Sequence, residues 1–216
     1  MRRVAAATAL LALLPAAARA QLRIGAAGEA RYVQHRVNAG NGVELSSGSA
    51  FGGRALFGIG THVEVSASVA QGSLTADSAQ ADDADLARGE ATVTVLPVPY
   101  LGIRVGGEQH TFTTPVVVQR WTSARIGGEA RLAFHGGVVT SLLRFDFYPT
   151  VSVSGTTKPN TAFGGASGII FRSGIVHAAI TYELERYDFP ASGGVTRHEQ
   201  VSYLVGTVGL ILGRRH

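Results

Sequence analysis

The sequence predicts an all-β fold, a closed antiparallel up-and-down barrel of about ten strands, with eight as the alternative count. Two patterns predict it. After residue 20, apolar residues recur mostly at every second position, as in strands with one apolar face, and helical spacing is scarce. The connections alternate between tight turns and longer polar loops, an asymmetry typical of barrels that cross a membrane.

Ten segments have the alternating pattern of a strand. They are 22–34, 49–57, 62–71, 87–96, 101–113, 119–134, 138–153, 162–171, 175–187 and 199–213. The tight turns are expected at 58–61, 97–100, 135–137 and 172–174, and the longer loops at 35–48, 72–86, 114–118, 154–161 and 188–198. The segment 114–118 is short and apolar for an outer loop, so the count falls toward eight if it lies inside a strand or a turn.

The first twenty residues have the three parts of a secretory signal peptide. Arg2 and Arg3 precede an apolar run over 4–14, and the small residues Ala18 and Ala20 form a cleavage pattern. The apolar run is shorter than the roughly 20 residues that a transmembrane helix needs. We therefore expect cleavage after Ala20, which leaves residues 21–216 as one barrel domain.

Charge and cysteine content exclude several classes of protein. Residues 1–20 hold three of the 19 basic residues and none of the 15 acidic ones, so the remaining chain has a net charge of +1. Nucleic-acid binding needs a clustered basic face, and the sequence offers little support for one. The chain has no cysteine, so burial and backbone pairing must stabilise it in the compartment to which the leader directs it.

Separating each strand by parity places nearly all its charge on one face. The other face is apolar, as in Ile24, Val65, Val93, Ile103 and Phe145. The charged face, which we expect to line the lumen, carries Arg23, Glu29, Arg31, Arg54, Glu64, Glu90, Arg104, Glu108, Arg125, Glu129, Arg131, Arg144, Asp146, Glu183 and Glu185.

Parity alone allows two barrels, because a soluble lipocalin-like barrel would turn its apolar face inward. The loop asymmetry, the positive mean hydropathy and the aromatic residues near strand ends favour the membrane version. These aromatics are Tyr32, Phe51, Phe147 and Phe163 toward the loops and Phe57, Tyr100, Phe134 and Phe171 toward the turns. The last strand has an ambiguous parity, because Tyr203 and Val205 compete with Leu204 and Val208 for the apolar face.

The predicted lumen is close to neutral, with seven arginines and eight carboxylates. A buried charge is costly unless it is paired and hydrogen-bonded, so these residues predict an ion-pair network that fills the barrel. Small inward residues such as Gly102 and Gly106 leave a narrow channel for small solutes as an alternative.

In this pattern of leader, strands and loops, the sequence resembles the small outer-membrane β-barrel superfamily of OmpA-like and OmpX-like proteins. The resemblance covers 21–216 and depends on pattern, not on a specific motif. It implies the outer membrane of a Gram-negative-type bacterium, contact with outer-membrane lipid, and assembly by the barrel-assembly machinery. Such proteins commonly end in an aromatic residue, whereas this chain ends in Arg214, Arg215 and His216.

No pattern of catalytic, cofactor-binding or metal-binding residues stands out. Barrel lipid A deacylases share a His-x-Ser pair that is absent here, and omptin proteases need Asp-Asp and His-Asp pairs, which only Asp188 and His198 approach. Asp77, Asp82, Asp83 and Asp85 form an acidic loop without EF-hand spacing. We therefore expect a structural or surface-contact barrel without cofactors. A narrow channel, an enzyme acting on envelope lipid or peptide, and a soluble binding barrel are the alternatives.

Overall fold

The computed structural model describes residues 22–40, 42–79 and 81–213. The expected signal peptide and its cleavage after Ala20 lie outside these residues and stay predictions. Within the described chain, no helix has the length and apolar character that a membrane span requires.

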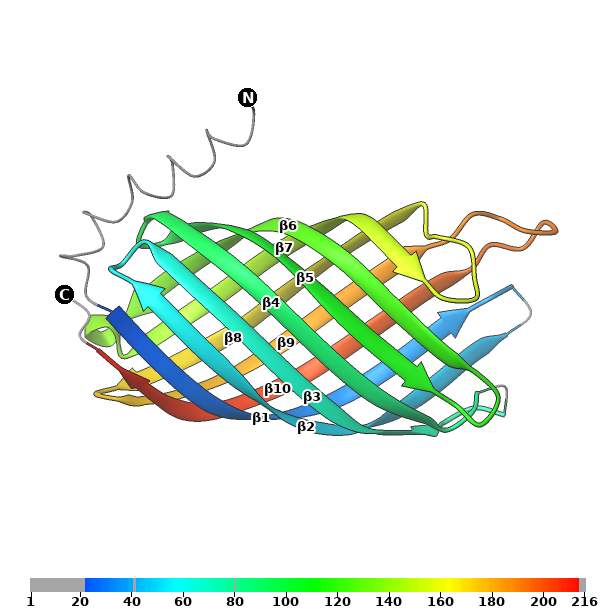
Figure 1. Ribbon diagram of the computed structural model, residues 1–216, viewed down its shortest axis with the longest axis horizontal. Helices are drawn as coiled ribbons and strands as arrows, with labels where there is room; N and C mark the ends of the chain where they lie inside the picture. Colours follow the sequence, from blue (N-terminus) through cyan, green and yellow to red (C-terminus); the bar gives the residue numbers. More distant parts are fainter. Residues whose placement is uncertain (1–21, 41, 80, 214–216) are drawn as a thin grey trace, which may run out of the picture.

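Ten antiparallel strands form a closed barrel in which each strand pairs with its neighbours in sequence and β1 pairs with β10 (Figure 1). They are β1 Leu22–Asn38, β2 Val43–Ile59, β3 Val63–Ala76, β4 Ala84–Val98, β5 Leu101–Thr113, β6 Val118–Phe134, β7 Val139–Val153, β8 Thr161–Ser173, β9 Val176–Asp188 and β10 His198–Leu212. A short 3₁₀ turn, His135–Gly137, joins β6 to β7. The start of β1 and the end of β10 lie at the same end of the barrel as the tight turns (Figure 1, left).

The strand count of ten is confirmed, and the alternative of eight is wrong. The deciding segment is 114–117, which forms a turn between β5 and β6 in which the Thr114 amide donates to the Val117 carbonyl at 2.9 Å. The longer connections, at 39–42, 77–83, 114–117, 154–160 and 189–197, all lie at the barrel end opposite the tight turns.

Several residues expected in loops belong to strands. The expected loops 35–48 and 72–86 shrink to 39–42 and 77–83, because β1, β2, β3 and β4 continue with full pairing, for instance between Val37 and Glu44. These segments lack the apolar outer parity that marks the rest of each strand, and their polar residues therefore resembled loops.

The outer face is apolar over the half of the barrel nearest the tight turns, which we call the belt. On β1 it runs from Leu22 to Tyr32, and on β10 from Leu204 to Leu212. Exposed aromatics border the belt on both sides, with Tyr32, Phe51, Phe147 and Phe163 toward the loops and Phe57, Tyr100, Phe134 and Phe171 toward the turns. This arrangement is that of a transmembrane barrel with two interfacial girdles.

Beyond the belt, the polarity of the two faces inverts. On β1 the outward side chains become Gln34, Arg36 and Asn38, while the inward ones become the buried Val33 and Val37. The same inversion on β10 explains its ambiguous parity, because Tyr203 points inward above the belt and Val205 points inward at the upper boundary of the belt, while Leu204 and Val208 face lipid. The barrel thus continues past the membrane as a water-soluble β-barrel.

The inverted part encloses a cluster of buried apolar side chains, the apolar cap. It comprises Val33, Ala50, Ala70, Leu74, Leu86, Phe112, Trp121, Tyr148, Val151, Val153, Ala162, Tyr187, Phe189, Val201, Tyr203 and Val205. Trp121 and Tyr187 lie in contact within it, with ring centroids 4.7 Å apart and ring planes tilted by 54°. Trp121 is the only tryptophan of the chain, so its fluorescence reports on the cap.

Two local features shape the wall. The pairing of β6 with β7 shifts register between Ala124 and Ile126, which leaves Pro149 in a bulge where no ladder hydrogen bond from it is needed. On the inward face, a Cβ on Gly52 would lie 1.9 Å from the Val69 carbonyl oxygen and one on Gly72 would lie 2.0 Å from that of Ser49. Any larger residue at these two positions would clash with the neighbouring strand, so glycine is required for the backbones to approach this closely.

The inversion predicts that an added charge destabilises the protein at an outward position within the belt but not at an outward position above it. Ala67→Arg within the belt should lower the free energy of unfolding in lipid vesicles by about 2–4 kcal/mol, the cost of arginine near the bilayer midplane. Thr75→Arg, also outward on β3 but above the belt, should change it by less than about 0.5 kcal/mol. Denaturant titration followed by Trp121 fluorescence measures both, and equal destabilisation by the two variants would contradict the inversion.

Candidate functional site

The lumen has three levels along the barrel axis. A polar cavity lies at the turn end, a layer of ion pairs fills the middle, and the apolar cap fills the loop end. Each level limits what can enter or cross the barrel.

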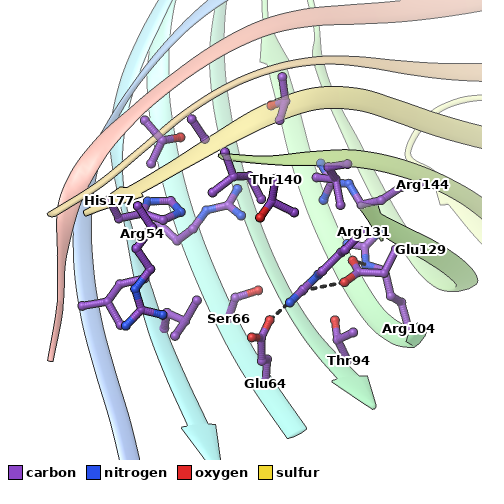
Figure 2. Close-up of a pocket in the computed structure, with 18 of the residues that line it drawn as sticks. Arg54, Glu64, Ser66, Thr94, Arg104, Glu129, Arg131, Thr140, Arg144 and His177 are labelled. Carbon is purple, nitrogen blue, oxygen red and sulfur yellow. Dashed lines mark hydrogen bonds and ion pairs between the residues drawn. The ribbon is translucent and has the colours of Figure 1, made fainter. Parts of the chain in front are cut away.

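The cavity at the turn end, which we call the vestibule, has a volume of about 140 Å³ and is lined by side chains from all ten strands (Figure 2). Glu64 joins Arg23 at 3.0 Å and Arg131 at 2.6 Å. Arg131 also contacts Glu129 at 2.5 Å. The wall thus combines ionic groups with apolar side chains such as Leu142 and Ile211, whereas the outer face of the belt is apolar.

A second group of ion pairs, the charged layer, separates the vestibule from the cap. At its centre, Arg88 reaches Glu90 at 3.2 Å, Glu108 at 3.0 Å and Glu185 at 2.8 Å. The Arg88 guanidinium also lies 4.3 Å from the centre of the Tyr203 ring. Three carboxylates and an aromatic ring thus hold the Arg88 guanidinium in the middle of the lumen.

Other pairs complete the charged layer around its circumference. Glu29 accepts from Arg31 at 2.7 Å and Arg54 at 2.5 Å. Arg144 pairs with Glu183 at 2.7 Å, and Arg104 with Asp146 at 2.7 Å. Arg125 lies 3.3 Å from Glu90. A buried charge with its partner removed would be strongly destabilising, so these contacts make the charged interior compatible with folding.

Every charged residue that the sequence assigned to the lumen takes part in at least one of these ion pairs. The sequence analysis missed Arg88, although its parity is that of Glu90, two residues along β4. It also missed Glu199, which is buried at the cap and contacts His35 at 3.1 Å and Arg197. Glu199 begins the expected strand 199–213, but the ambiguous parity of that strand gave no reason to place its carboxylate inside the barrel.

The Asp188–His198 pair that approaches the omptin pattern and the acidic loop that was considered for calcium do not come together in one centre. His198 contacts Asp188 at 2.5 Å where β9 and β10 meet the rim. Asp83 and Asp85 lie beside the β3–β4 hairpin, where they accept from the Ala76 amide and the Ser73 hydroxyl, each at 2.8 Å. These strands are not neighbours in the barrel, and the filled cap lies inside the wall at this level.

No protein-family profile and no curated protein sequence matches the chain. Among solved structures, it is similar to the outer membrane protease OmpT from Escherichia coli, with 9% identity over 90% of this chain and 97% of that chain and a TM-score of 0.57. The fold is that of an outer-membrane β-barrel. The apolar belt therefore lies in the outer membrane of a Gram-negative-type bacterium, with lipid around it.

Two autotransporter barrels are also similar to this outer-membrane barrel. They are the β domain of Brka from Bordetella (12% identity, 86% of this chain and 98% of that chain, TM-score 0.47) and the translocator domain of NalP from Neisseria meningitidis (14% identity, 97% and 95%, TM-score 0.43).

The charged layer predicts a characteristic double-mutant cycle. Asp146→Asn removes the closest partner of Arg104 and should cost about 3 kcal/mol, because a buried guanidinium loses its counter-charge. Adding Arg104→Met should recover most of this loss, since no unpaired charge is then buried. Equilibrium unfolding followed by Trp121 fluorescence measures Asp146→Asn, Arg104→Met and the double variant. A double variant that is destabilised by the sum of the two single effects would show that the pair is not coupled.

Proposed function

We propose that this protein is a non-conducting outer-membrane barrel that presents its rim as a rigid contact surface outside the cell. Export by the predicted signal peptide and insertion by the barrel-assembly machinery are parts of this proposal. The observation that carries it is the filled lumen, in which the charged layer and the apolar cap lie one above the other.

The cap opposes transport more strongly than the charged layer does. Leu74, Trp121, Tyr187 and Tyr203 are each at most 2% exposed, so their side chains occupy the space that a solute would need. Water and ions avoid an apolar constriction of this kind, because nothing there replaces their hydration. The vestibule thus ends below the cap, and the channel alternative has less support.

The shape of the loop end favours contact with another surface. The strands themselves continue beyond the belt, so the rim is held by β pairing and not by long loops. The turn between β5 and β6 carries an apolar tip in which Val116 is 80% exposed and Val117 and Val118 are more than half exposed. Adjacent exposed apolar side chains at a rigid edge are a feature of interaction sites.

Conductance tests the sealed lumen. The purified protein, checked for folding by its heat-modifiable mobility on a gel, should add no steady current to a planar lipid bilayer, because the cap excludes hydrated ions. A stable open current at low voltage would overturn the proposal in favour of the channel.

Cysteine labelling tests which end faces outward. Because the chain has no cysteine, a single introduced thiol is the only target for a maleimide that cannot cross membranes. Val117→Cys at the rim should be labelled on intact cells, whereas Ser173→Cys at a tight turn should be labelled only after the outer membrane is permeabilised. The reverse pattern would place the rim in the periplasm and exclude a surface-contact role.

A further inference from the structure

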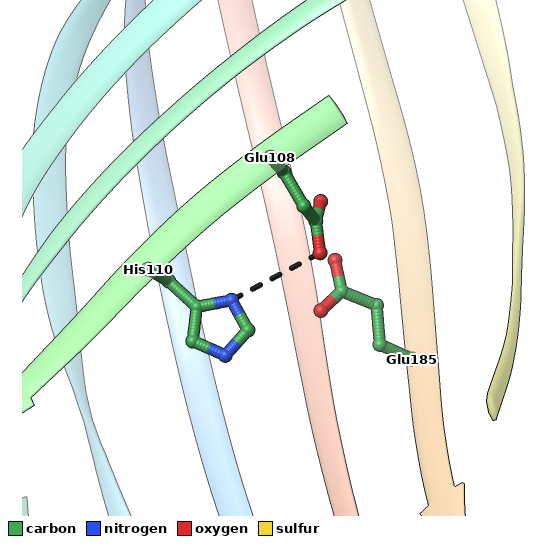
Figure 3. A group of neighbouring side chains, drawn as sticks. All are labelled: Glu108, His110 and Glu185. Carbon is green, nitrogen blue, oxygen red and sulfur yellow. Dashed lines mark ion pairs between the residues drawn. The ribbon is translucent and has the colours of Figure 1, made fainter. Parts of the chain in front are cut away.

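Three buried side chains below the cap converge from opposite sides of the lumen. Glu108 and His110 lie on β5 and Glu185 lies on β9, and their potential ligand atoms are all within 4.8 Å of one another (Figure 3). β5 and β9 are not neighbours in the wall, so this cluster connects distant strands across the barrel.

His110 is the unusual member of this cluster. It is 1% exposed, and neither Nδ1 nor Nε2 has a hydrogen-bond partner within the described chain. Its Nδ1 lies 3.9 Å from Glu108 Oε1, toward the two carboxylates (Figure 3). Phe112 and Trp121 enclose the imidazole, each with a ring centroid 5.4 Å away. Buried polar atoms are normally satisfied, so a nitrogen aimed at two carboxylates without a contact requires an explanation.

Contacts from neighbouring residues hold the two carboxylates in fixed orientations, as is common for metal ligands. Arg88 holds Glu108 Oε2 at 3.0 Å and Glu185 Oε1 at 2.8 Å, and the Tyr187 hydroxyl donates to Glu185 Oε2 at 3.0 Å. Such outer contacts fix the direction of ligating side chains in metal sites. Glu108 Oε1 is left facing His110, with the Tyr187 hydroxyl at 3.5 Å.

Charge also favours a cation at this position. Arg88 is the only ion-pair partner of Glu185 in the described structure, and the same guanidinium serves Glu90 and Glu108. Arg125 adds only a 3.6 Å contact to Glu108. Glu108 and Glu185 thus depend on Arg88 and on the more distant Arg125, both of which also contact Glu90, and a buried charge needs compensation.

We propose that Glu108, His110 and Glu185 bind one divalent transition-metal ion of the zinc class. One imidazole nitrogen and two carboxylate oxygens suit Zn²⁺, Co²⁺, Fe²⁺ or Mn²⁺, whereas Ca²⁺ and Mg²⁺ prefer oxygen ligands alone. The ion clamps β5 to β9 beneath the apolar cap. This site goes beyond the sequence expectation, in which no metal ligands were assigned.

Metal content and Trp121 fluorescence test the site together. The folded barrel, soaked with Zn²⁺ or Co²⁺ and freed of excess metal by gel filtration, should retain about one ion per chain by mass spectrometry. Co²⁺ should quench Trp121, because the indole lies beside His110. A wild-type barrel that retains neither Zn²⁺ nor Co²⁺ overturns the proposal.

Variants locate the ion, with folding checked by heat-modifiable mobility. His110→Gln and Glu185→Gln should each weaken Co²⁺ binding at least about tenfold and remove the quenching. Glu183→Gln, on the same face of β9, and His198→Ala, at the rim, are matched controls that should leave both signals unchanged. Retention and quenching that persist in both ligand variants, or that vanish in His198→Ala, would overturn the proposal.

Discussion

The structure depends on one constraint, which is that the surroundings of each strand change from hydrocarbon to water partway along its length. Within the belt, hydrocarbon requires an apolar exterior, and the charged residues can only point inward. Above the belt, water permits a polar exterior, and the interior becomes apolar, as in any soluble barrel. Arg31 and Val33, two residues apart on one inward face of β1, mark the boundary.

The charged layer follows from this constraint. The side chains that fill the lumen within the belt come from strands whose outward side chains are apolar. Arginine and glutamate are long enough to meet at the centre of the lumen. Their pairing offsets the cost of burying charged groups away from water. Arg88 has the central role because it contacts three carboxylates from β4, β5 and β9. The cap lies directly on this layer, so the two halves of the interior support each other.

The sequence predicted the belt half of the fold well and the upper half poorly, for a physical reason. Alternation such as Arg23-Ile24 or Glu64-Val65 is visible because lipid exposure demands it on every strand. From Val33 to Val37 the alternation continues, but its sign reverses, and the sequence pattern from His35 onward therefore predicts a loop instead of a strand. A search for this reversal would have found Val37, Leu74 and Phe112 as core residues. Glu108 and Glu185 could be assigned to the lumen by parity, but their meeting with His110 depends on closure between strands far apart in sequence.

The opposed polarities of inside and outside have a consequence for how the protein reaches its final state. A sheet that entered the bilayer before β1 met β10 would expose Arg104, Glu129 and their neighbours to acyl chains across its inner face. A sheet that closed first in water would leave the apolar belt exposed to water. Both intermediates are unfavourable. Ion pairs such as Arg31–Glu183 and Arg88–Glu185 join strands that come together only when the barrel closes, so pairing of the interior charges depends on closure.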